Sequence, residues 1–184
     1  MVAIGASTGG PPAVQQVLAA LKGTHACVLI AQHMPALFTK AFAERLEHAL
    51  RLPVAEAAGG ERALPGGAYV APGGKHLELV REDGVLKLKV SAPAGGDKHA
   101  PSIDRLFESV AASGVHAHAL VLTGMGNDGA RGVNAIAKAG GVVWAESDKT
   151  AVVAGMPQAA MKTGHVSFVL PIDELGPELA KTLR

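Results

Sequence analysis

Apolar, strand-like runs alternate with segments of helical period along most of this chain, and this alternation is the strongest constraint on its fold. The strand-like runs are 2–4, 26–31, 117–122, 142–145 and 166–170. After the first run, Pro11 and Pro12 suit the first turn of a helix, and apolar residues recur at helical spacing from Val14 to Leu21. Such alternation is typical of a parallel sheet covered by helices on both faces, so we expect an α/β fold.

Residues 54–90 interrupt this rhythm with shorter, alternating runs. "HLELV" and "VLKLKV" lie on either side of Arg81-Glu82-Asp83-Gly84, which predicts an inserted antiparallel hairpin. The following Gly-, Ala- and Pro-rich segment, 91–99, is expected to be a surface loop, because neither flank could bury a core alone. We therefore expect residues 1–184 to form a single domain.

The composition excludes several classes of protein. With 48% hydrophobic and 18% charged residues, the chain reads as a soluble globular protein. A net charge of +1 and 3% aromatic residues argue against nucleic acid as a partner. There is no signal-peptide pattern, and no apolar run approaches the roughly 20 residues that cross a bilayer, so no membrane insertion and a cytoplasmic location are expected. The single cysteine, Cys27, lies in an apolar run and is expected to be buried and inert.

Three polar residues follow predicted strands, at the ends where open α/β sheets bind ligands: Ser7, His33 and Asp128. A serine hydroxyl becomes nucleophilic when an imidazole takes its proton, and a carboxylate fixes the tautomer of that imidazole. Gly5-Ala6-Ser7-Thr8-Gly9 also has the G-x-S-x-G form of a nucleophile elbow. Each residue alone has a simpler interpretation: Ser7 as a helix cap or phosphate ligand, His33 as a satisfied strand-end histidine, and Asp128 as a turn residue.

The main alternative is a Rossmann-like dinucleotide-binding protein. Gly124 to Gly129 fits G-x-G-x-x-G after a strand, and Glu146 follows the next strand at about the offset of a ribose-binding acid. Asp128, however, would bring negative charge close to a pyrophosphate that this motif binds through bare N–H groups. The first glycine-rich turn also lacks the lysine of a P-loop.

Several stretches together carry a resemblance to a known family. They are "VAIGASTGGPPAV", "AQHMPALFTKAFAERL", "YVAPGGKHLEL", "PSIDRLFESVA", "LTGMGNDGARG" and "AVVAGMPQAAM". In order and spacing, over nearly the whole chain, they resemble the catalytic domain of the chemotaxis protein-glutamate methylesterases, the CheB family. The resemblance implies a three-layer α/β/α sandwich on a mainly parallel, doubly wound sheet.

The resemblance also implies roles for individual residues. Ser7 would be the nucleophile, His33 the general base and Asp128 the residue that orients it. The backbone N–H of Met125 would contribute to the oxyanion hole, and Thr8 would belong to the site. The implied function is a serine hydrolase that removes methyl groups from glutamate γ-esters on cytoplasmic chemoreceptor helices, with glutamine deamidation in some members.

No cofactor or metal is implied, and the protein partner is the methylated receptor. Many family members carry a phosphoacceptor receiver domain before the catalytic domain. No receiver sequence is present here, so regulation by aspartyl phosphorylation is not carried over and an accessible site is expected. Activity is expected to fall as the pH drops through the titration of the histidine base, which is near 6.5 for an unperturbed imidazole.

The remaining candidates receive structural interpretations. His116 and His118 form an H-x-H pair with no cysteine or nearby acid to complete a metal site. Trp144 is expected to be buried against a helix, and Gly126 and Gly129 to serve backbone geometry. The methionines at the strand ends either line a groove for a receptor helix or pack in the core; they are Met34, Met125 and Met156. Lys75 and His76, in "APGGKH", match a family motif to which no role is assigned.

Overall fold

A computed structural model describes residues 1–183. Its main sheet has seven strands in the order β3-β4-β2-β1-β7-β8-β9, and every neighbouring pair is parallel. The strands are β1 (Val2–Ala6), β2 (Val28–Gln32), β3 (Val54–Glu56), β4 (Ala68–Val70), β7 (His118–Val121), β8 (Val142–Glu146) and β9 (Phe168–Leu170). The predicted hairpin is formed by β5 (His76–Glu82) and β6 (Val85–Ser91), which pair antiparallel apart from this sheet. The predicted fold class is confirmed.

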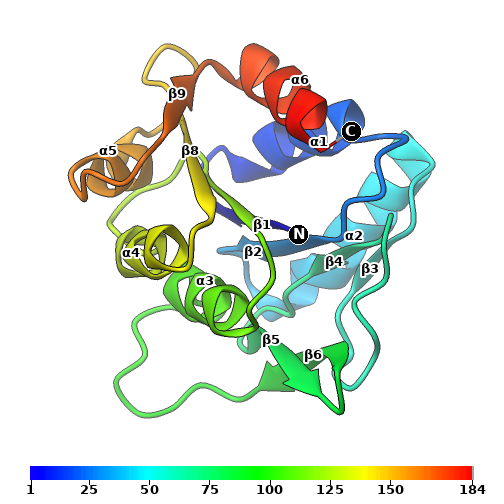
Figure 1. Ribbon diagram of the computed structural model, residues 1–184. Coiled ribbons are helices and arrows are strands. Elements are labelled where there is room, and N and C mark those ends of the chain that lie inside the picture. Colours follow the sequence, from blue (N-terminus) through cyan, green and yellow to red (C-terminus); the bar gives the residue numbers. More distant parts are fainter. Residues whose placement is uncertain (184) are drawn as a thin grey trace.

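Helices cover both faces of the sheet (Figure 1). They are α1 (Gly10–Ala20), α2 (Ala36–Leu50), α3 (Ile103–Ala112), α4 (Ala130–Lys138), α5 (Gly155–Met161) and α6 (Ile172–Thr182). One hydrophobic cluster joins the sheet to α1, α2 and α6, and a second joins it to α3, α4, α5 and the hairpin. The result is the three-layer sandwich. None of the helices in residues 1–183 has the length and apolar character needed to cross a membrane.

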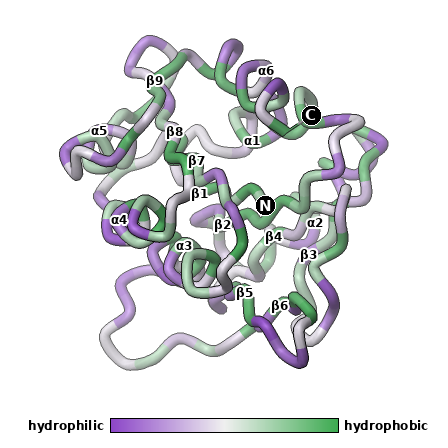
Figure 2. The backbone as a smooth tube through the Cα atoms, in the orientation of Figure 1, coloured by the Kyte–Doolittle hydropathy of each residue, from purple (hydrophilic) through white to green (hydrophobic). Residues whose placement is uncertain are grey.

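The strands are apolar because both of their faces are buried. All five residues of β1 and of β2 are buried, and the central strands are green in the hydropathy view of Figure 2, whereas the turn of the hairpin is purple. Trp144 on β8 is buried as predicted, and its ring stacks on that of Phe168 on the neighbouring strand, with 4.2 Å between ring centroids.

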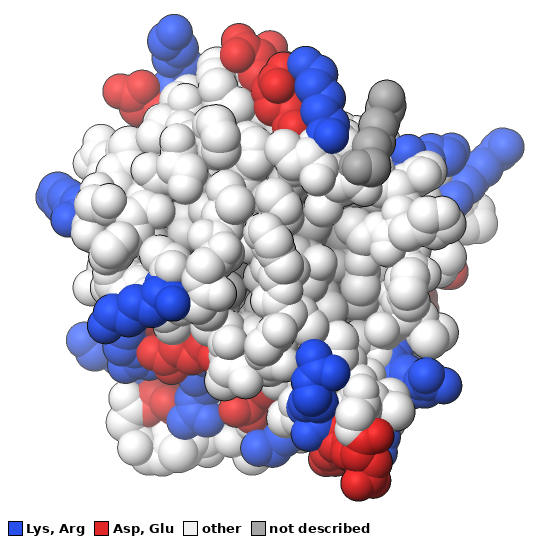
Figure 3. Space-filling view, in the orientation of Figure 1, with Lys and Arg blue, Asp and Glu red and all other residues white. Residues whose placement is uncertain are grey.

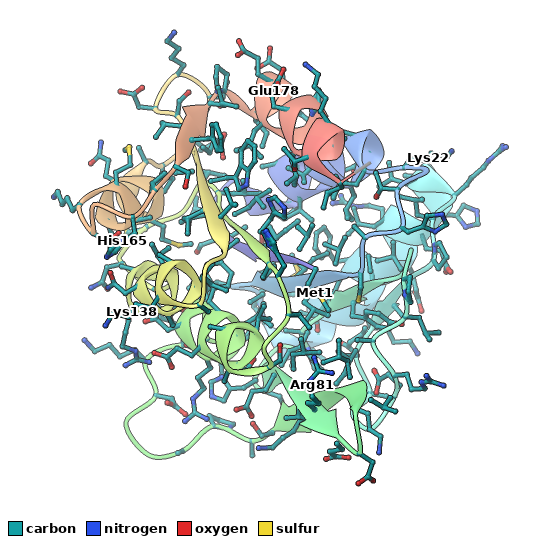
Figure 4. All side chains as sticks on the ribbon, in the orientation of Figure 1. Met1, Lys22, Arg81, Lys138, His165 and Glu178 are labelled. Atoms are coloured by element: carbon teal, nitrogen blue, oxygen red, sulfur yellow. The ribbon has the colours of Figure 1, made fainter. Side chains whose placement is uncertain are left out.

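The strand order determines where a site can form. From β1 the chain proceeds to β2 on one side, and it later returns to β7 on the other side. Ligands of open α/β sheets bind at such a reversal, at the carboxyl ends of the strands. Figures 3 and 4 show the molecule from the other end of the sheet, where the strands begin. Met1, which precedes β1, lies near the middle of this face, and charged side chains of both signs lie around its rim.

Candidate active site

The carboxyl ends of three adjacent strands bring the predicted residues together. β1 pairs with β2 up to Ala6 and Gln32, so Ser7 and His33 are the next residues on two neighbouring strands. The other neighbour of β1 is β7, and Asp128 lies in the loop between β7 and α4. Sequence spacing alone could not establish that these strands are neighbours.

His33 and Asp128 form a direct contact: His33 Nε2 is 2.8 Å from Asp128 Oδ2. Both side chains are largely buried, with exposed fractions of 13% and 6%. Because an ionised carboxylate only accepts hydrogen bonds, Nε2 carries the proton and donates it to Asp128. In the neutral ring the second nitrogen, Nδ1, then has a free lone pair that can accept a proton.

Asp128 is held at the amino terminus of α3. The backbone N–H groups of Ile103 and Asp104 donate to its two oxygens at 2.8 and 2.9 Å, and the Ser102 hydroxyl lies 3.2 Å from Oδ1. Burial raises the pKa of Asp128, but the hydrogen bonds from His33 and from these N–H groups outweigh it and lower the pKa to about 2. The carboxylate is therefore ionised at neutral pH.

A reciprocal contact fixes the loop that carries Asp128. Asp104, in the first turn of α3, accepts hydrogen bonds from the N–H groups of Gly129 and Gly132 at 2.9 and 2.8 Å, at the start of α4. Each of the two helices is thus capped by an aspartate from the other segment. Burial and the nearby charge of Asp128 raise the pKa of Asp104, against the hydrogen bond from Gly132. Asp104 is a residue of the site beyond those predicted from the sequence, although an acid two residues after Ser102 in "PSID" is typical of a helix start.

Ser7 lies at the tip of the turn between β1 and α1. Its N–H donates to Thr123 O at 2.9 Å, and Gly9 has the positive φ of 80° that the turn requires. Pro11 and Pro12 occupy the first turn of α1 and have no N–H, so this helix start is poorly suited to hold a phosphate. Among residues 1–183 the Ser7 hydroxyl has no hydrogen-bond partner, so its contact with His33 is the one link of a triad that is not formed.

The loop after β7 packs directly against Ser7. A Cβ atom placed on Gly124 would lie 2.7 Å from Ser7 Cβ, so only glycine allows this approach. In the described part of the chain the N–H of the next residue, Met125, donates no hydrogen bond, while its side chain is 70% exposed. Gly126 and Gly129 have φ values of 93° and 101°, which agrees with their predicted role in backbone geometry. Thr8 is exposed beside Ser7, and its carbonyl accepts a hydrogen bond from Thr123 Oγ1 at 2.8 Å.

The contacts of Glu146 disfavour the dinucleotide alternative. Glu146 is buried, and its two oxygens accept hydrogen bonds from Thr123 N–H and from the Thr150 hydroxyl, each at 2.9 Å. Both oxygens are thus occupied within the protein, where a ribose-binding acid would present them to a ligand.

Other candidates divide between core and surface. Met156 is buried and packs beneath Gly124, so it does not line a groove, because the loop after β7 covers it. Met34 is half-buried and lines an apolar groove with Phe38 and Phe42. His118 is buried and accepts a hydrogen bond from Trp144 Nε1 at 3.2 Å. Within residues 1–183, no group of three or more His, Cys, Asp or Glu side chains is arranged to hold a metal ion.

One residue of the site, His99, lies in segment 91–99, which the sequence predicts to be a surface loop. The ring of His99 stacks on the ring of His33, with 4.3 Å between centroids and 12° between planes. His99, Asn127 and Arg131 are among the residues that line a cavity of about 390 Å³ beside Asp128. No local pattern signals this contact, because it depends on how the loop folds back over the sheet.

Comparisons with known proteins agree with this geometry. The family model described as CheB methylesterase matches residues 2–179. A protein-glutamate methylesterase/protein-glutamine glutaminase of Myxococcus xanthus is 50% identical over 186 residues, which cover 100% of this chain and 54% of that protein. A protein of the same name from Salmonella typhimurium is 44% identical over 180 residues, 97% of this chain and 52% of that protein.

A solved structure is also similar. The crystal structure of the Thermotoga maritima CheB methylesterase catalytic domain superposes with a TM-score of 0.93 at 36% identity, and the match covers 98% of this chain and 97% of that one. The chain thus spans about half the length of the curated relatives it matches and nearly all of that catalytic domain. The chain belongs to the CheB methylesterase family.

Proposed function

We propose that this chain is a serine hydrolase that removes methyl groups from glutamate γ-methyl esters of bacterial chemoreceptors, with Ser7, His33 and Asp128 as its catalytic triad. The observation that carries the proposal is the His33–Asp128 hydrogen bond at the carboxyl end of β2, one strand away from Ser7. The relatives from Myxococcus xanthus and Salmonella typhimurium are named for methylesterase and glutaminase activity, which supports the same chemistry here.

In the first half of the reaction, Ser7 Oγ attacks the ester carbonyl carbon while its proton passes to His33 Nδ1. Asp128, ionised and buried, stabilises the imidazolium that forms. The carbonyl oxygen becomes an oxyanion, and the N–H of Met125, which has no partner in the described part of the chain, is the donor we assign to it. The bond to the methoxy group then breaks, and His33 returns the proton so that methanol leaves.

In the second half, water attacks the glutamyl-serine ester. His33 takes a proton from the water and gives it to Ser7 Oγ, which releases glutamate and restores the enzyme. A glutamine side chain can follow the same steps with ammonia as the leaving group, which is the reaction that the second part of the relatives' name describes. None of these steps calls for a metal or a cofactor.

Residues 1–184 act in this proposal as one catalytic domain whose protein substrate is the cytoplasmic helix of a receptor, which places the enzyme in the cytoplasm. The exposed Thr8 and Met125 flank the nucleophile where that helix must approach.

The test uses a receptor fragment in two forms, one methylated at its glutamates and one with glutamines at these positions. Methanol release from the first and ammonia release from the second are measured for the purified chain and for Ser7→Ala. We expect methanol release that falls by about 10³-fold or more in Ser7→Ala. Methanol release at the same rate in both proteins would refute the assignment of Ser7, and no release by the unaltered chain would refute the substrate.

A further inference from the structure

His76, the histidine of the "APGGKH" motif to which no role is assigned above, is buried at the start of β5. Its side chain is 0% exposed. The N–H of Ser102 donates to His76 Nδ1 at 3.1 Å, and His76 Nε2 lies 3.0 Å from Asp97 Oδ2. A backbone N–H can only donate, so Nδ1 is unprotonated and Nε2 carries the proton that goes to Asp97. Both contacts together require the neutral ring in one tautomer.

The first contact leads to Asp128. Ser102 is the N-cap of α3, and its hydroxyl lies 3.2 Å from Asp128 Oδ1. The next two N–H groups along the chain hold the same carboxylate. His76 therefore fixes the backbone at the point where α3 begins to surround Asp128.

The second contact leads to His99. Asp97 lies two residues before His99, in the long loop between β6 and α3 at the lower left of Figure 1. Besides His76, Asp97 binds the N–H of Ala94 at 2.7 Å and the guanidinium of Arg105 at 3.1 Å. These contacts tie an otherwise exposed loop to the hairpin and to α3, and they hold it where the ring of His99 covers that of His33.

We propose that His76 is a positioning residue of the active site, which holds His33 in place from two sides through its two ring nitrogens. Through Ser102 it supports Asp128, which binds the edge of the His33 ring; through Asp97 it supports His99, which covers the face of that ring. A His33 ring that turned away from either partner would no longer present Nδ1 to Ser7. The proposal rests on the proposed function for its effect on turnover, while its effect on His33 itself is independent of any substrate.

Two substitutions separate the two contacts. Asparagine places its amide near the position of Nδ1, so His76→Asn can keep an acceptor for Ser102 N–H but loses the donor to Asp97. Glutamine reaches the position of Nε2, so His76→Gln can keep the donor to Asp97 but loses the acceptor for Ser102. His25→Gln is the matched control, because His25 is exposed and remote from the site. Asp97→Ala, at a position that is partly exposed, removes the second contact without altering the buried ring.

Two measurements are made on each folded variant. The first is the rate at which diethyl pyrocarbonate modifies His33, resolved from the other histidines by peptide mass spectrometry. The second is kcat and KM for methanol release. We expect His76→Asn and Asp97→Ala to raise the modification rate of His33 about tenfold, because His99 no longer covers the ring, and His76→Gln to lower kcat by about ten- to a hundredfold with a smaller change in KM.

The outcomes distinguish this proposal from the proposed function. If the unaltered chain releases no methanol but His33 is protected as described and exposed in Asp97→Ala, the proposed function fails and the positioning of His33 stands. If Asp97→Ala folds with unchanged His33 reactivity and unchanged kcat, the proposal is overturned. Equal loss of stability in both His76 variants, with His33 reactivity and kcat as in His25→Gln, would also overturn it, because His76 would then serve the fold alone.

Discussion

Replacing Asp128 by asparagine should destabilise the protein as well as inactivate it. The carboxylate accepts from His33 and from the N–H groups of Ile103 and Asp104, and these bonds lie on both of its oxygens. An asparagine side chain has one oxygen and one NH₂ group, so in either orientation its NH₂ group faces a backbone N–H. One buried donor then has no acceptor, which costs about 1–3 kcal/mol.

The magnitude can also be obtained from the pKa of Asp128, which is lowered from its ordinary value of 3.8 to about 2. This difference corresponds to about 2.5 kcal/mol of stability that the ionised carboxylate contributes at neutral pH. The two routes agree on a loss of about 2–3 kcal/mol for Asp128→Asn, or roughly 8 °C in Tm for a chain of this length.

The sign of the pH dependence follows from the lowered pKa. The contribution is complete above the ordinary pKa of 3.8 and is lost as the pH falls through about 2, because protonation then removes the charge in the folded protein as well. The difference in free energy of unfolding between the unaltered chain and Asp128→Asn should therefore shrink by about 1 kcal/mol between pH 6 and pH 3.

Urea denaturation at pH 6 and pH 3 measures this difference, with Asp148→Asn as the control because Asp148 is exposed. The control should unfold at the same urea concentration as the unaltered chain. A loss below about 0.5 kcal/mol for Asp128→Asn at pH 6, the range of an ordinary surface substitution, would refute the reasoning, as would a difference that does not change with pH.

Three further predictions follow from buried groups. Gly124→Ala should abolish methanol release, because an added Cβ at this position lies 2.7 Å from Ser7 Cβ. Gly95→Ala should retain it, because a Cβ there meets nothing within 4 Å. Steady-state kinetics measure both variants, and a Gly124→Ala protein that kept its kcat would contradict the prediction. Burial raises the pKa of Cys27 to about 11, so iodoacetamide at pH 8 should label Cys27 only after urea unfolding, and fast labelling of the native protein would be the opposing result. Burial, and to a smaller extent the charge of His116, lowers the pKa of His118 to about 4. The stability that the neutral His118 ring contributes is therefore complete above pH 6.5, and up to about 3 kcal/mol of it is lost as the pH falls through 4. Thermal unfolding between pH 7 and pH 4 should therefore be less pH-dependent in His118→Gln, and equal slopes would contradict the assignment.

The sequence predicted the elements of the fold because they depend on local patterns. The βα alternation and the hairpin around Asp83-Gly84 both follow from periodicity and turn residues, and the structure confirms them. The short strands β3 and β4 were harder to place, because three residues carry too little pattern to show that they extend the parallel sheet.

The site was predictable only in part, for a related reason. Ser7, His33 and Asp128 were identified because each follows a strand, but their proximity depends on the strand order, which spacing does not determine. The roles of Asp104 and His99 depend on contacts between a loop and a helix that are distant in sequence, and no periodic pattern encodes them. The glycine pattern around Asp128 also fits a dinucleotide-binding loop. The negative charge of Asp128 already argues against a bound pyrophosphate, and the internal hydrogen bonds of Glu146 in the structure add to that argument.

The central claim is that Ser7 is a nucleophile activated by His33 and Asp128, and covalent labelling tests it without requiring the right receptor. The chain is incubated with a fluorophosphonate, which reacts with activated serines, and the adduct is located by peptide mass spectrometry in the unaltered chain, in His33→Gln and in the control His25→Gln, whose altered position is exposed. We expect one adduct on Ser7, formed at a rate that falls at least about a hundredfold in His33→Gln and is unchanged in His25→Gln. An unlabelled Ser7, or labelling of Ser7 at the same rate without His33, would contradict it.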